Sequence, residues 1–489
     1  MNNDIAQLEP RELWTNFDAL NAVPRASKKE DQVVAFMMDF AAGLSLDAYK
    51  DETGNIIIRK PATNGLENAM TVVMQSHLDM VHQKNNDTEF DFSTQGIKML
   101  VDGDWVRAEG TTLGADNGIG VAATMAILAS KEIAHPAIEA LFTVDEETGM
   151  TGAMGLKRGI LQGEILLNLD TEQDHEIDIG CAGGIDVTAT KTYTEEPAPE
   201  TGIPYLITVR GLQGGHSGMD IHKGLGNANK IMNRLLFQAE MHAGLRLSNL
   251  QGGSLRNAIP RESVAQVVVA SDKEAAFLQC LQMAVDDIKF EYRSIEPSLA
   301  ITAAKQDAVP PSVMPVAEQK ALIQALYAAH NGVYKMSAAL DNLVETSNNI
   351  ARVSVEKGSI SIQCLTRSSV ETSKFDLANA LRAAFELMGC DVEFSGSYPG
   401  WAPNPSSEIL KLLTHVYEKQ NNAKPDVVAC HAGLECGILG RNYPNMDMIS
   451  FGPTILGAHS PAERVSISSV QKFWKFLLEV LAHIPAKAR

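Results

Sequence analysis

Several short apolar runs along the chain stop at an acid or a histidine. Runs of this length and composition are typical of buried strands. In α/β proteins the carboxyl ends of strands are where functional sites are built. The pattern therefore predicts a site at the ends of three strands. These runs and the residues that follow them are 71–76 before His77, 138–144 before Glu146 and Glu147, and 165–169 before Asp170.

The remaining pattern predicts an α/β fold with an insertion. Up to about Asp186, strand-like runs alternate with helical stretches, which favours a mixed sheet covered by helices on both faces. Beyond it we expect strands at 205–210 and 263–270, helices at 225–242 and 375–388, and a hairpin of 350–355 with 359–366.

Domain boundaries follow from where the candidate site residues lie. Residues 187–397 contribute no ligand candidate, whereas His459 lies almost three hundred residues beyond Asp170. The chain must therefore fold back on itself. We expect a split catalytic domain formed by 1–186 and 398–489, and an inserted lid domain of two α+β units at 187–397.

Two further residues extend the three strand ends to a candidate two-metal site. Asp116 precedes an apolar helical stretch, and His459 lies in the C-terminal part of the chain. A catalytic zinc usually has three protein ligands and one open position. A bridging Asp116 would give three ligands to each of two metals, and three carboxylates leave one residual positive charge against two divalent ions. The proposed ligands are His77, Asp116, Glu147, Asp170 and His459.

Two neighbours of these ligands suit supporting roles. Asp79 lies two residues beyond His77, so both side chains lie on one face of an extended segment, and Asp79 can accept the second imidazole N–H. Glu146 precedes Glu147, and it can serve as general base toward the attacking water. Each motif alone also has an ordinary structural interpretation, such as a helix cap at Asp170. Their combination is what favours a metallohydrolase.

Composition excludes several classes of protein. A chain of 489 residues needs two or three domains. The net charge of −19 argues against nucleic acid or an anionic membrane as a partner. We expect a cytoplasmic protein, because the chain shows neither a signal peptide nor a membrane span, and its six scattered cysteines form no disulfide framework.

The motifs resemble the signature blocks of the M20 family of di-zinc metallopeptidases over nearly the whole chain. The blocks that carry the resemblance are His77–Met80, Gly114–Gly118, Asp145–Gly149, Asn168–Asp170, Gly214–Gly218, Arg256–Pro260 and Gly457–Pro461. Three further segments (85–88, 180–186 and 431–437) resemble a bacterial dipeptidase subgroup of that family. The resemblance implies the five ligands above, with Glu146 as the catalytic base and Asp79 beside it.

The resemblance also implies roles for three residues of the insert. His216 would stabilise the oxyanion, and Asn257 and Arg367 would bind the substrate carboxylate. An arginine suits this role because its planar fork can bind two oxygens. The implied function is metal-dependent hydrolysis of unblocked dipeptides with broad specificity, including Xaa-His dipeptides such as β-alanyl-histidine. A metal-bound hydroxide would be activated by Glu146.

Several alternatives stay open at this level. The same centre could serve an N-acyl amino acid deacylase or a tripeptide aminopeptidase, and a catalytically silent metal-binding scaffold is a third. Two histidines and three carboxylates suit Zn²⁺, with Co²⁺ or Mn²⁺ as substitutes. Small peptides are the expected partners, and a homodimer is the expected assembly. The sequence does not decide whether His216 acts in its own chain or in a partner's site.

Overall fold

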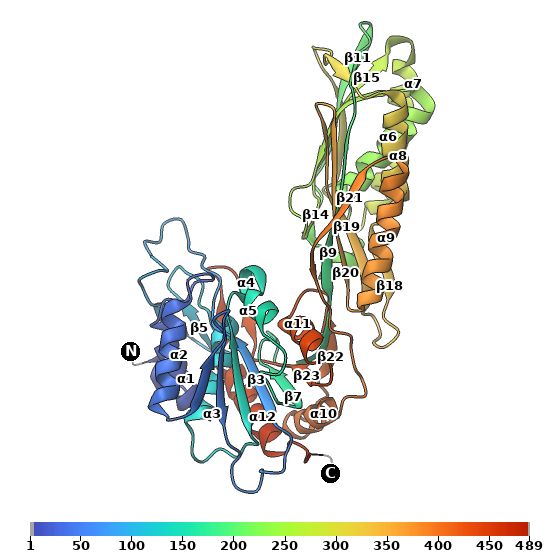
Figure 1. The fold of residues 1–489 in the computed structure, drawn as a ribbon. Helices are drawn as coiled ribbons and strands as arrows, with labels where there is room; N and C mark the ends of the chain where they lie inside the picture. Colours follow the sequence, from blue (N-terminus) through green and yellow to red (C-terminus); the bar gives the residue numbers. More distant parts are fainter. Residues whose placement is uncertain (1–3, 488–489) are drawn as a thin grey trace. The chain divides into compact units, whose positions relative to one another are not determined.

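The computed structural model describes residues 4–487, which form two compact units. Unit 1 contains Met1–Gly180, Pro403–Ala429 and Leu434–Arg489, and unit 2 contains Cys181–Ala402 and Cys430–Gly433. Unit 2 is therefore formed by one long insertion into the chain of unit 1 and by a second insertion of four residues. Both units combine helices with sheets, so the expected mixed α/β class is confirmed (Figure 1).

Unit 1 is built on an eight-stranded mixed sheet. In the centre, β3 runs parallel to both β6 and β7, so all three strands end at the same edge. This confirms the strands expected before His77, Glu146 and Asp170. In sheet order the strands are β1 (Asp47–Lys50), β2 (Ile56–Lys60), β6 (Ile138–Thr143), β3 (Val72–His77), β7 (Ile165–Asn168), β23 (Asp447–Ser450), β8 (Glu176–Cys181) and β22 (Asp426–Cys430).

The helices of unit 1 pack against this sheet. Helix α3 contacts both β3 and α1, whereas α10 contacts β23 and α12. In Figure 1 the α1–α3 pair lies to the left of the sheet and α10 to its right. The helices are η1 (Ile5–Gln7), α1 (Arg11–Asn21), α2 (Asp31–Gly43), α3 (Ala115–Ala129), α4 (Glu146–Gly149), α5 (Thr151–Gly155), α10 (Glu408–Asn421), α11 (Glu435–Asn442) and α12 (Ile467–Ala482).

Helix α12 shows why these segments are helical. Its buried residues Val470, Phe473 and Leu477 recur at spacings of three and four, which places them on one face. The Ser466 side chain caps the helix by accepting a hydrogen bond from the Ser469 backbone N–H. Burying a side chain of this size stabilises the fold by about 1.5–3 kcal/mol, so this face anchors the C-terminal part of the chain.

A second, four-stranded sheet joins the C-terminal part of unit 1 to its first part. Its strands are β24 (Ile455–Leu456), β25 (Arg464–Ser466), β5 (Trp105–Ala108) and β4 (Met99–Asp102) in that order. Because Arg464 pairs with Arg107 across β25 and β5, the loop that carries His459 is brought to the segment before Asp116. None of the helices in residues 4–487 combines the length and apolar composition needed to cross a membrane.

Unit 2 is built on one antiparallel sheet of nine strands. The expected hairpin is confirmed, because β19 and β20 pair from Glu356–Ser359 to Thr346–Ser368. The strands are β16 (Ala300–Lys305), β11 (Gly202–Arg210), β15 (Ser263–Ala270), β13 (Arg246–Gly252), β19 (Val344–Glu356), β20 (Ser359–Ser368), β9 (Gly183–Thr192) and β21 (Asp391–Tyr398), with β18 (Gly332–Met336) on β19.

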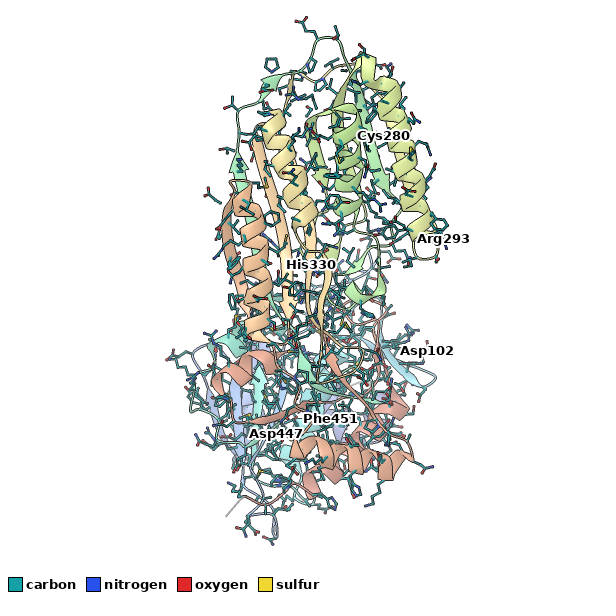
Figure 2. The ribbon with its side chains drawn as sticks, turned by 90° about the vertical axis from the view of Figure 1, so that its right-hand side faces the viewer. Asp102, Cys280, Arg293, His330, Asp447 and Phe451 are labelled. Carbon is teal, nitrogen blue, oxygen red and sulfur yellow. The ribbon has the colours of Figure 1, made fainter. Side chains whose placement is uncertain are left out.

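Four long helices lie side by side on one face of this sheet (Figures 1 and 2). They are α7 (Glu274–Tyr292), α6 (Ala228–Ala243), α8 (Val316–Ala328) and α9 (Glu371–Leu387). The division of the insert into two α+β units stays a prediction. The remaining elements are the pairs β12 (Gly215–His216) with β14 (Ala258–Ile259) and β10 (Glu196–Pro197) with β17 (Ser312–Val313), and the short helices η2 (Ile221–Lys223) and η3 (Ser271–Lys273).

Candidate metal centre

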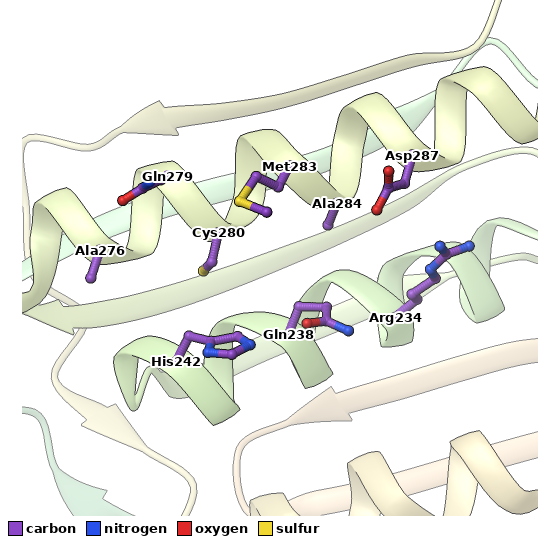
Figure 3. Close-up of a pocket in the computed structure, with 9 residues that line it drawn as sticks. All are labelled: Arg234, Gln238, His242, Ala276, Gln279, Cys280, Met283, Ala284 and Asp287. Atoms are coloured by element: carbon purple, nitrogen blue, oxygen red, sulfur yellow. The ribbon is translucent and has the colours of Figure 1, made fainter.

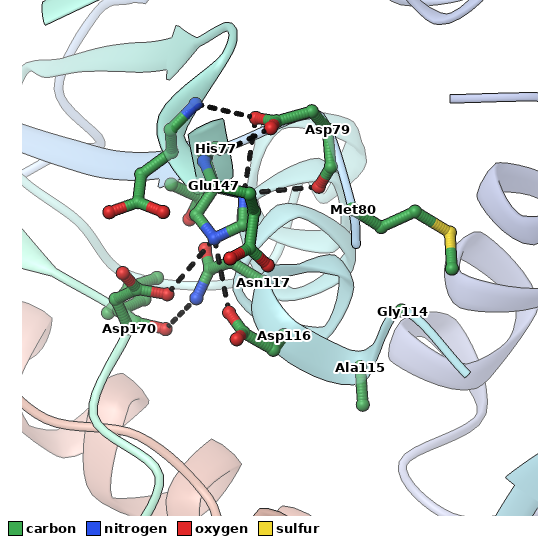
Figure 4. Close-up of polar contacts among 12 residues, drawn as sticks. His77, Asp79, Met80, Gly114, Ala115, Asp116, Asn117, Glu147 and Asp170 are labelled. Carbon is green, nitrogen blue, oxygen red and sulfur yellow. Dashed lines mark hydrogen bonds and ion pairs between the residues drawn. The ribbon is translucent and has the colours of Figure 1, made fainter. Parts of the chain in front are cut away.

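The strand ends of unit 1 and the start of α3 bring sequence-predicted residues together, and Figure 4 labels His77, Asp79, Asp116, Glu147 and Asp170 among them. His77 is the last residue of β3, Glu146 and Glu147 open α4 after β6, and Asp170 follows β7. Asp116 lies in the first turn of α3 with non-helical backbone angles, so its side chain does not follow the helix surface. The Asp116–Asn117 peptide bond is cis.

Asp116 occupies the middle of this cluster. Its Oδ1 atom lies 3.1 Å from His77 Nε2, and its Oδ2 atom lies 3.3 Å from His459 Nε2. The two oxygens of one carboxylate therefore face two different histidines. His77 Nε2 also lies 3.5 Å from Asp170 Oδ1, and His459 Nε2 lies 3.0 Å from Glu147 Oε2.

These distances define compact groups of potential ligands. In each group the donor atoms lie within 4.8 Å of one another, as a shared metal ion requires. Asp116 belongs to two of them, which is the arrangement expected of a bridging ligand. The groups are His77–Asp116–Asp170, Asp116–Glu147–His459 and His77–Glu146–Glu147.

Asp79 lies where it can orient both His77 and the Glu146 turn. Its Oδ1 is 3.4 Å from His77 Nδ1, on the ring side away from Asp116. Its carboxylate also accepts hydrogen bonds from the backbone N–H groups of Glu146 and Glu147, at 3.0 and 3.3 Å. One buried carboxylate thereby connects the ends of β3 and β6.

The electrostatics of the cluster fit a divalent cation. Burial raises the pKa of Glu146, Glu147 and Asp170, and neighbouring carboxylates raise it further, whereas the nearby histidines oppose the shift. The Asp170 Oδ1 atom is buried and accepts no hydrogen bond. Crowded carboxylates with an unsatisfied oxygen, together with imidazoles, form the oxygen and nitrogen donor set of a divalent metal ion.

The carboxylates of the cluster also shift the pKa of the histidine His459. Hydrogen bonds to Asp116 and Glu147 raise the pKa of His459 to about 11, although its side chain is 57% exposed. The backbone of His459 has a φ of +64°, a left-handed conformation that is uncommon for a residue other than glycine. The loop conformation therefore fixes the direction in which the His459 imidazole points, toward Asp116 and Glu147.

Sequence reasoning missed several buried charged residues around the centre. Glu435 accepts hydrogen bonds from Gln75 Nε2 and Thr143 Oγ1, both at 2.6 Å, and burial raises its pKa to about 8. Arg25 and Glu463 contact the backbone that carries the ligands. The partners of these charged residues lie far away in the sequence, so no local motif indicates that they support the site.

In unit 2, His216 has a defined hydrogen-bonding state. Its Nδ1 atom accepts hydrogen bonds from the backbone N–H groups of Gly218 and Met219, at 3.2 and 3.0 Å. Burial and the Arg367 charge lower the pKa of His216, which favours the neutral ring. A neutral ring that accepts at Nδ1 carries its proton on Nε2, so Nε2–H is free to donate.

Arg367 lies in β20, where it is 5% exposed. Its Nη1 donates to the Tyr398 hydroxyl at 2.8 Å, whereas its Nε is buried without a hydrogen-bond partner. No carboxylate in residues 4–487 lies within ion-pair distance of this guanidinium. A buried arginine with unused donors is suited to bind an anion.

His431 lies near these residues and was not predicted as a site residue. Its Nε2 is 2.8 Å from Ser347 Oγ, and burial, followed by the charge of Arg367, lowers its pKa to about 3. Asn257, by contrast, is exposed, and its backbone carbonyl accepts a hydrogen bond from the Ser217 N–H at 2.8 Å. We call Arg367, His216 and His431 the basic cluster.

A groove of about 400 Å³ between α6 and α7 of unit 2 contains none of these residues (Figure 3). It is lined by Arg234, His242, Cys280 and Met283, among others. These side chains make no compact group of metal ligands, because the three groups in the described chain all lie in unit 1. Polar chemistry rather than cavity size therefore identifies the site.

Comparison with known proteins gives a consistent result. The sequence profile of Peptidase family M20/M25/M40 matches residues 73–483. The chain is 42% identical over 485 residues to the cytosol non-specific dipeptidase of Escherichia coli (strain K12), covering 99% of this chain and 100% of that protein.

Solved structures support the same assignment. The aminoacylhistidine dipeptidase of Vibrio alginolyticus superposes with a TM-score of 0.94 at 45% identity, over 99% of both chains. The aminopeptidase PepT of Bacillus cereus shares the fold, with a TM-score of 0.57 at 16% identity over 97% of this chain and 98% of that one. With a family profile across most of its length, the chain belongs to the M20 family of peptidases and is a hydrolase that acts on peptide bonds.

Proposed function

We propose that this protein is a dipeptidase that holds two divalent metal ions, with zinc as the first candidate and Co²⁺ or Mn²⁺ as substitutes. The observation that carries the metal centre is the position of Asp116, whose two oxygens face His77 and His459 separately. The substrate class is supported by the relatives at 42% and 45% identity, both of which are named dipeptidases.

The ligand roles follow from the two groups that share Asp116. His77 and Asp170 would complete one metal position, and Glu147 and His459 the other. This set is the one that the sequence predicted. The Asp79 carboxylate beside His77 Nδ1 would fix the tautomer that leaves Nε2 as the ligand atom.

The reaction requires a base that is not itself a ligand. Two bound divalent cations would lower the pKa of a water molecule and polarise the scissile carbonyl. Glu146 would take the proton from the attacking water and return it to the leaving nitrogen. Its position supports this role, because its backbone N–H donates to Asp79 while its carboxylate lies within 4.8 Å of ligand atoms of His77 and Glu147.

Residues of unit 2 would recognise the substrate. We propose that His216 donates its Nε2–H to the oxyanion, which the two hydrogen bonds to its Nδ1 support. Arg367 would bind the carboxylate at the C-terminus of the dipeptide, together with Asn257. The unused donors of the buried Arg367 support this assignment.

The substrate range, cellular location and assembly complete the proposal. Xaa-His dipeptides such as β-alanyl-histidine are the first candidates, because one relative is named an aminoacylhistidine dipeptidase. A cytoplasmic location is supported by a relative that is named a cytosol enzyme. The homodimer stays a prediction, and sedimentation of the purified protein measures it.

A panel of substrates tests the function. Purified protein loaded with zinc is incubated with β-alanyl-histidine, Gly-His, Leu-Gly, a tripeptide and an N-acetyl amino acid, and the products are identified by mass spectrometry. The matched control is the same protein after chelation. We expect cleavage of the dipeptides alone and complete loss of cleavage without metal.

Other outcomes separate the alternatives. Cleavage of the acetylated compound alone would make the protein a deacylase and remove the dipeptide roles of Arg367 and Asn257. Cleavage of the tripeptide alone would indicate an aminopeptidase. Binding of metal without any turnover would indicate a scaffold.

A further inference from the structure

The segment 113–116, which carries Asp116, is held through its backbone by a single distant carboxylate. Glu463 Oε2 accepts hydrogen bonds from the N–H groups of Leu113 and Gly114, at 2.7 and 3.0 Å. Glu463 Oε1 accepts from Ala115 and Asp116, at 2.8 and 3.3 Å. Four successive amides thus converge on one side chain that is 2% exposed.

Arg25 holds the same segment through its carbonyl side. Its Nη2 donates to the Gly114 carbonyl at 2.5 Å, and its Nη1 donates to the carbonyls of Leu78 and Asp79 at 3.1 and 3.2 Å. The guanidinium therefore connects the segment that follows His77 with the segment that precedes Asp116. A fork with several fixed donors can make these contacts at once, which a lysine cannot.

The glycines of the Gly114–Gly118 motif make room for this guanidinium. A Cβ atom at Gly114 would lie 2.4 Å from Arg25 Nη2, and a Cβ at Gly118 would lie 2.7 Å from it. Gly114 also has a φ of +71°, which disfavours other residues. The glycines flanking Asp116 are thus explained by the approach of Arg25.

Glu463 links the segment to a third ligand. It lies four residues after His459, in the same loop, and its own N–H donates to the Ser460 carbonyl at 3.0 Å. The exposed His459 needs such support, because its surroundings alone do not bury it. Arg25 and Glu463 together therefore touch the backbone of three ligand-bearing segments, 77–79, 113–116 and 459–463.

The charge and the hydrogen bonds of Arg25 fit a structural role beside the cluster. They leave the carboxylate oxygens of the proposed ligands free. Burial lowers the pKa of Arg25 to about 10, and the charges of Glu463, Asp79, Asp116 and Glu147 oppose this shift, so the guanidinium stays cationic at neutral pH. Its hydrogen bonds nevertheless go to backbone carbonyls and Asn21, not to the carboxylates of the ligands. The donor set of the centre stays available for cations.

We propose that Arg25 and Glu463 are positioning residues that clamp the segments carrying His77, Asp116 and His459, so that the metal centre is assembled before metal binds. The proposal rests on the proposed metal centre. It adds that the affinity of the centre depends on two residues that touch neither metal nor substrate. Support of this kind is typically worth about 10–100-fold in metal affinity.

The first test measures metal affinity in variants. The metal-free full-length protein is titrated with Co²⁺ against a competing chelator, and the absorption spectrum of the bound cobalt is recorded. The variants are Glu463→Gln and Arg25→Lys. Glu139→Gln is the matched control, because Glu139 is a 3% exposed carboxylate that accepts two backbone N–H bonds near the opposite end of β6.

We expect Glu463→Gln and Arg25→Lys to weaken Co²⁺ binding by about 10–100-fold and to change the cobalt spectrum. Glu139→Gln should keep the affinity of the wild type even where its melting temperature falls. Unchanged affinity and spectrum in both clamp variants would overturn the proposal. A wild-type protein that binds no cobalt would instead overturn the metal centre itself.

A second test needs no variant, so it also decides the case in which both clamp variants fail to fold. Amide hydrogen exchange of the 113–116 segment is measured in the wild-type protein with and without metal. Assembly before binding predicts strong protection in the metal-free protein. Exchange that is fast without metal and slow with it would show that the metal, not the clamp, orders the segment.

Discussion

The acidic centre of unit 1 and the basic cluster of unit 2 respond to burial in opposite directions. In unit 1, burial raises the pKa of Glu146 and Asp170, and carboxylates surround the His77 imidazole. In unit 2, burial lowers the pKa of His216 and His431, so that Arg367 carries the charge. One region is suited to hold cations, and the other offers a guanidinium and neutral donors to an anion.

Under the proposed function, this difference would divide the steps of peptide hydrolysis between the two regions. In the proposed function, the centre of unit 1 would activate water, whereas the basic cluster would bind the oxyanion and the substrate carboxylate. Substitutions in the two regions should therefore fail differently. Changes in unit 1 should lower turnover or metal content, and changes in unit 2 should leave the metal in place.

The largest effect is expected from Glu146→Gln. Loss of a general base should lower kcat by roughly 10²–10⁴-fold, because proton transfer from the attacking water and to the leaving nitrogen is no longer assisted. Metal content should stay near two per chain, as measured by mass spectrometry of the bound metals. Loss of both metals in this variant would show that Glu146 is a ligand instead.

A smaller effect on turnover is expected from His216→Ala. Removing one oxyanion donor should lower kcat by roughly 10²–10³-fold while the metal content stays unchanged. His222→Ala is the matched control, because His222 is an exposed histidine six residues away. Equal kinetics of the two variants would contradict the assignment of His216 to the oxyanion.

Arg367→Ala should act on binding more than on turnover. Loss of charged hydrogen bonds to the substrate carboxylate should raise KM for free dipeptides by roughly 10–100-fold. Substrates with an amidated C-terminus lack that charge and should be much less affected. An equal rise in KM for both kinds of substrate would mean that Arg367 does not recognise the carboxylate.

The smallest effect on activity at neutral pH is expected from His431→Gln, which instead changes stability in acid. The folded pKa of about 3 lies below the value of about 6.5 expected for an unfolded histidine. The unfolded chain therefore binds the proton more readily, and stability should fall as the pH drops from about 6.5 to 3.

The groups around His431 determine how protonation of its ring affects the stability of the fold. Arg367, His216 and His222 are the charged or titratable groups that act on its ring, and Ser347 is its hydrogen-bond partner. The contribution is at most about 5 kcal/mol. Urea unfolding of wild type and His431→Gln between pH 7 and 4 measures it, and parallel pH profiles for the two proteins would contradict a neutral buried His431.

Local patterns were enough to predict the strand ends and much of the fold. The run before His77 forms β3, and the strand predicted at 263–270 forms β15 with those bounds. The helix predicted at 225–242 starts later, at Ala228, because the Asn227 side chain caps it by accepting from Asn229 N and Lys230 N. A cap of this type is a sequence signal that could have set the boundary.

The support around the ligands could not be predicted in the same way. Glu463 accepts a hydrogen bond from the Ala115 N–H, 348 residues away in the sequence. Arg25 donates to the Gly114 carbonyl, 89 residues away. Such contacts depend on the tertiary fold, and a buried glutamate or arginine has no local pattern. The sequence could show which residues have metal-binding chemistry, but not what holds them.

The most direct test of this account is the position of the metals. Crystals of the zinc-loaded protein would be measured on both sides of the zinc absorption edge, which locates zinc by its anomalous scattering. The account predicts two peaks about 3.5–4 Å apart, one near each oxygen of Asp116, with His77 on one side and His459 on the other. A single peak, or peaks that Asp116 does not bridge, would contradict it.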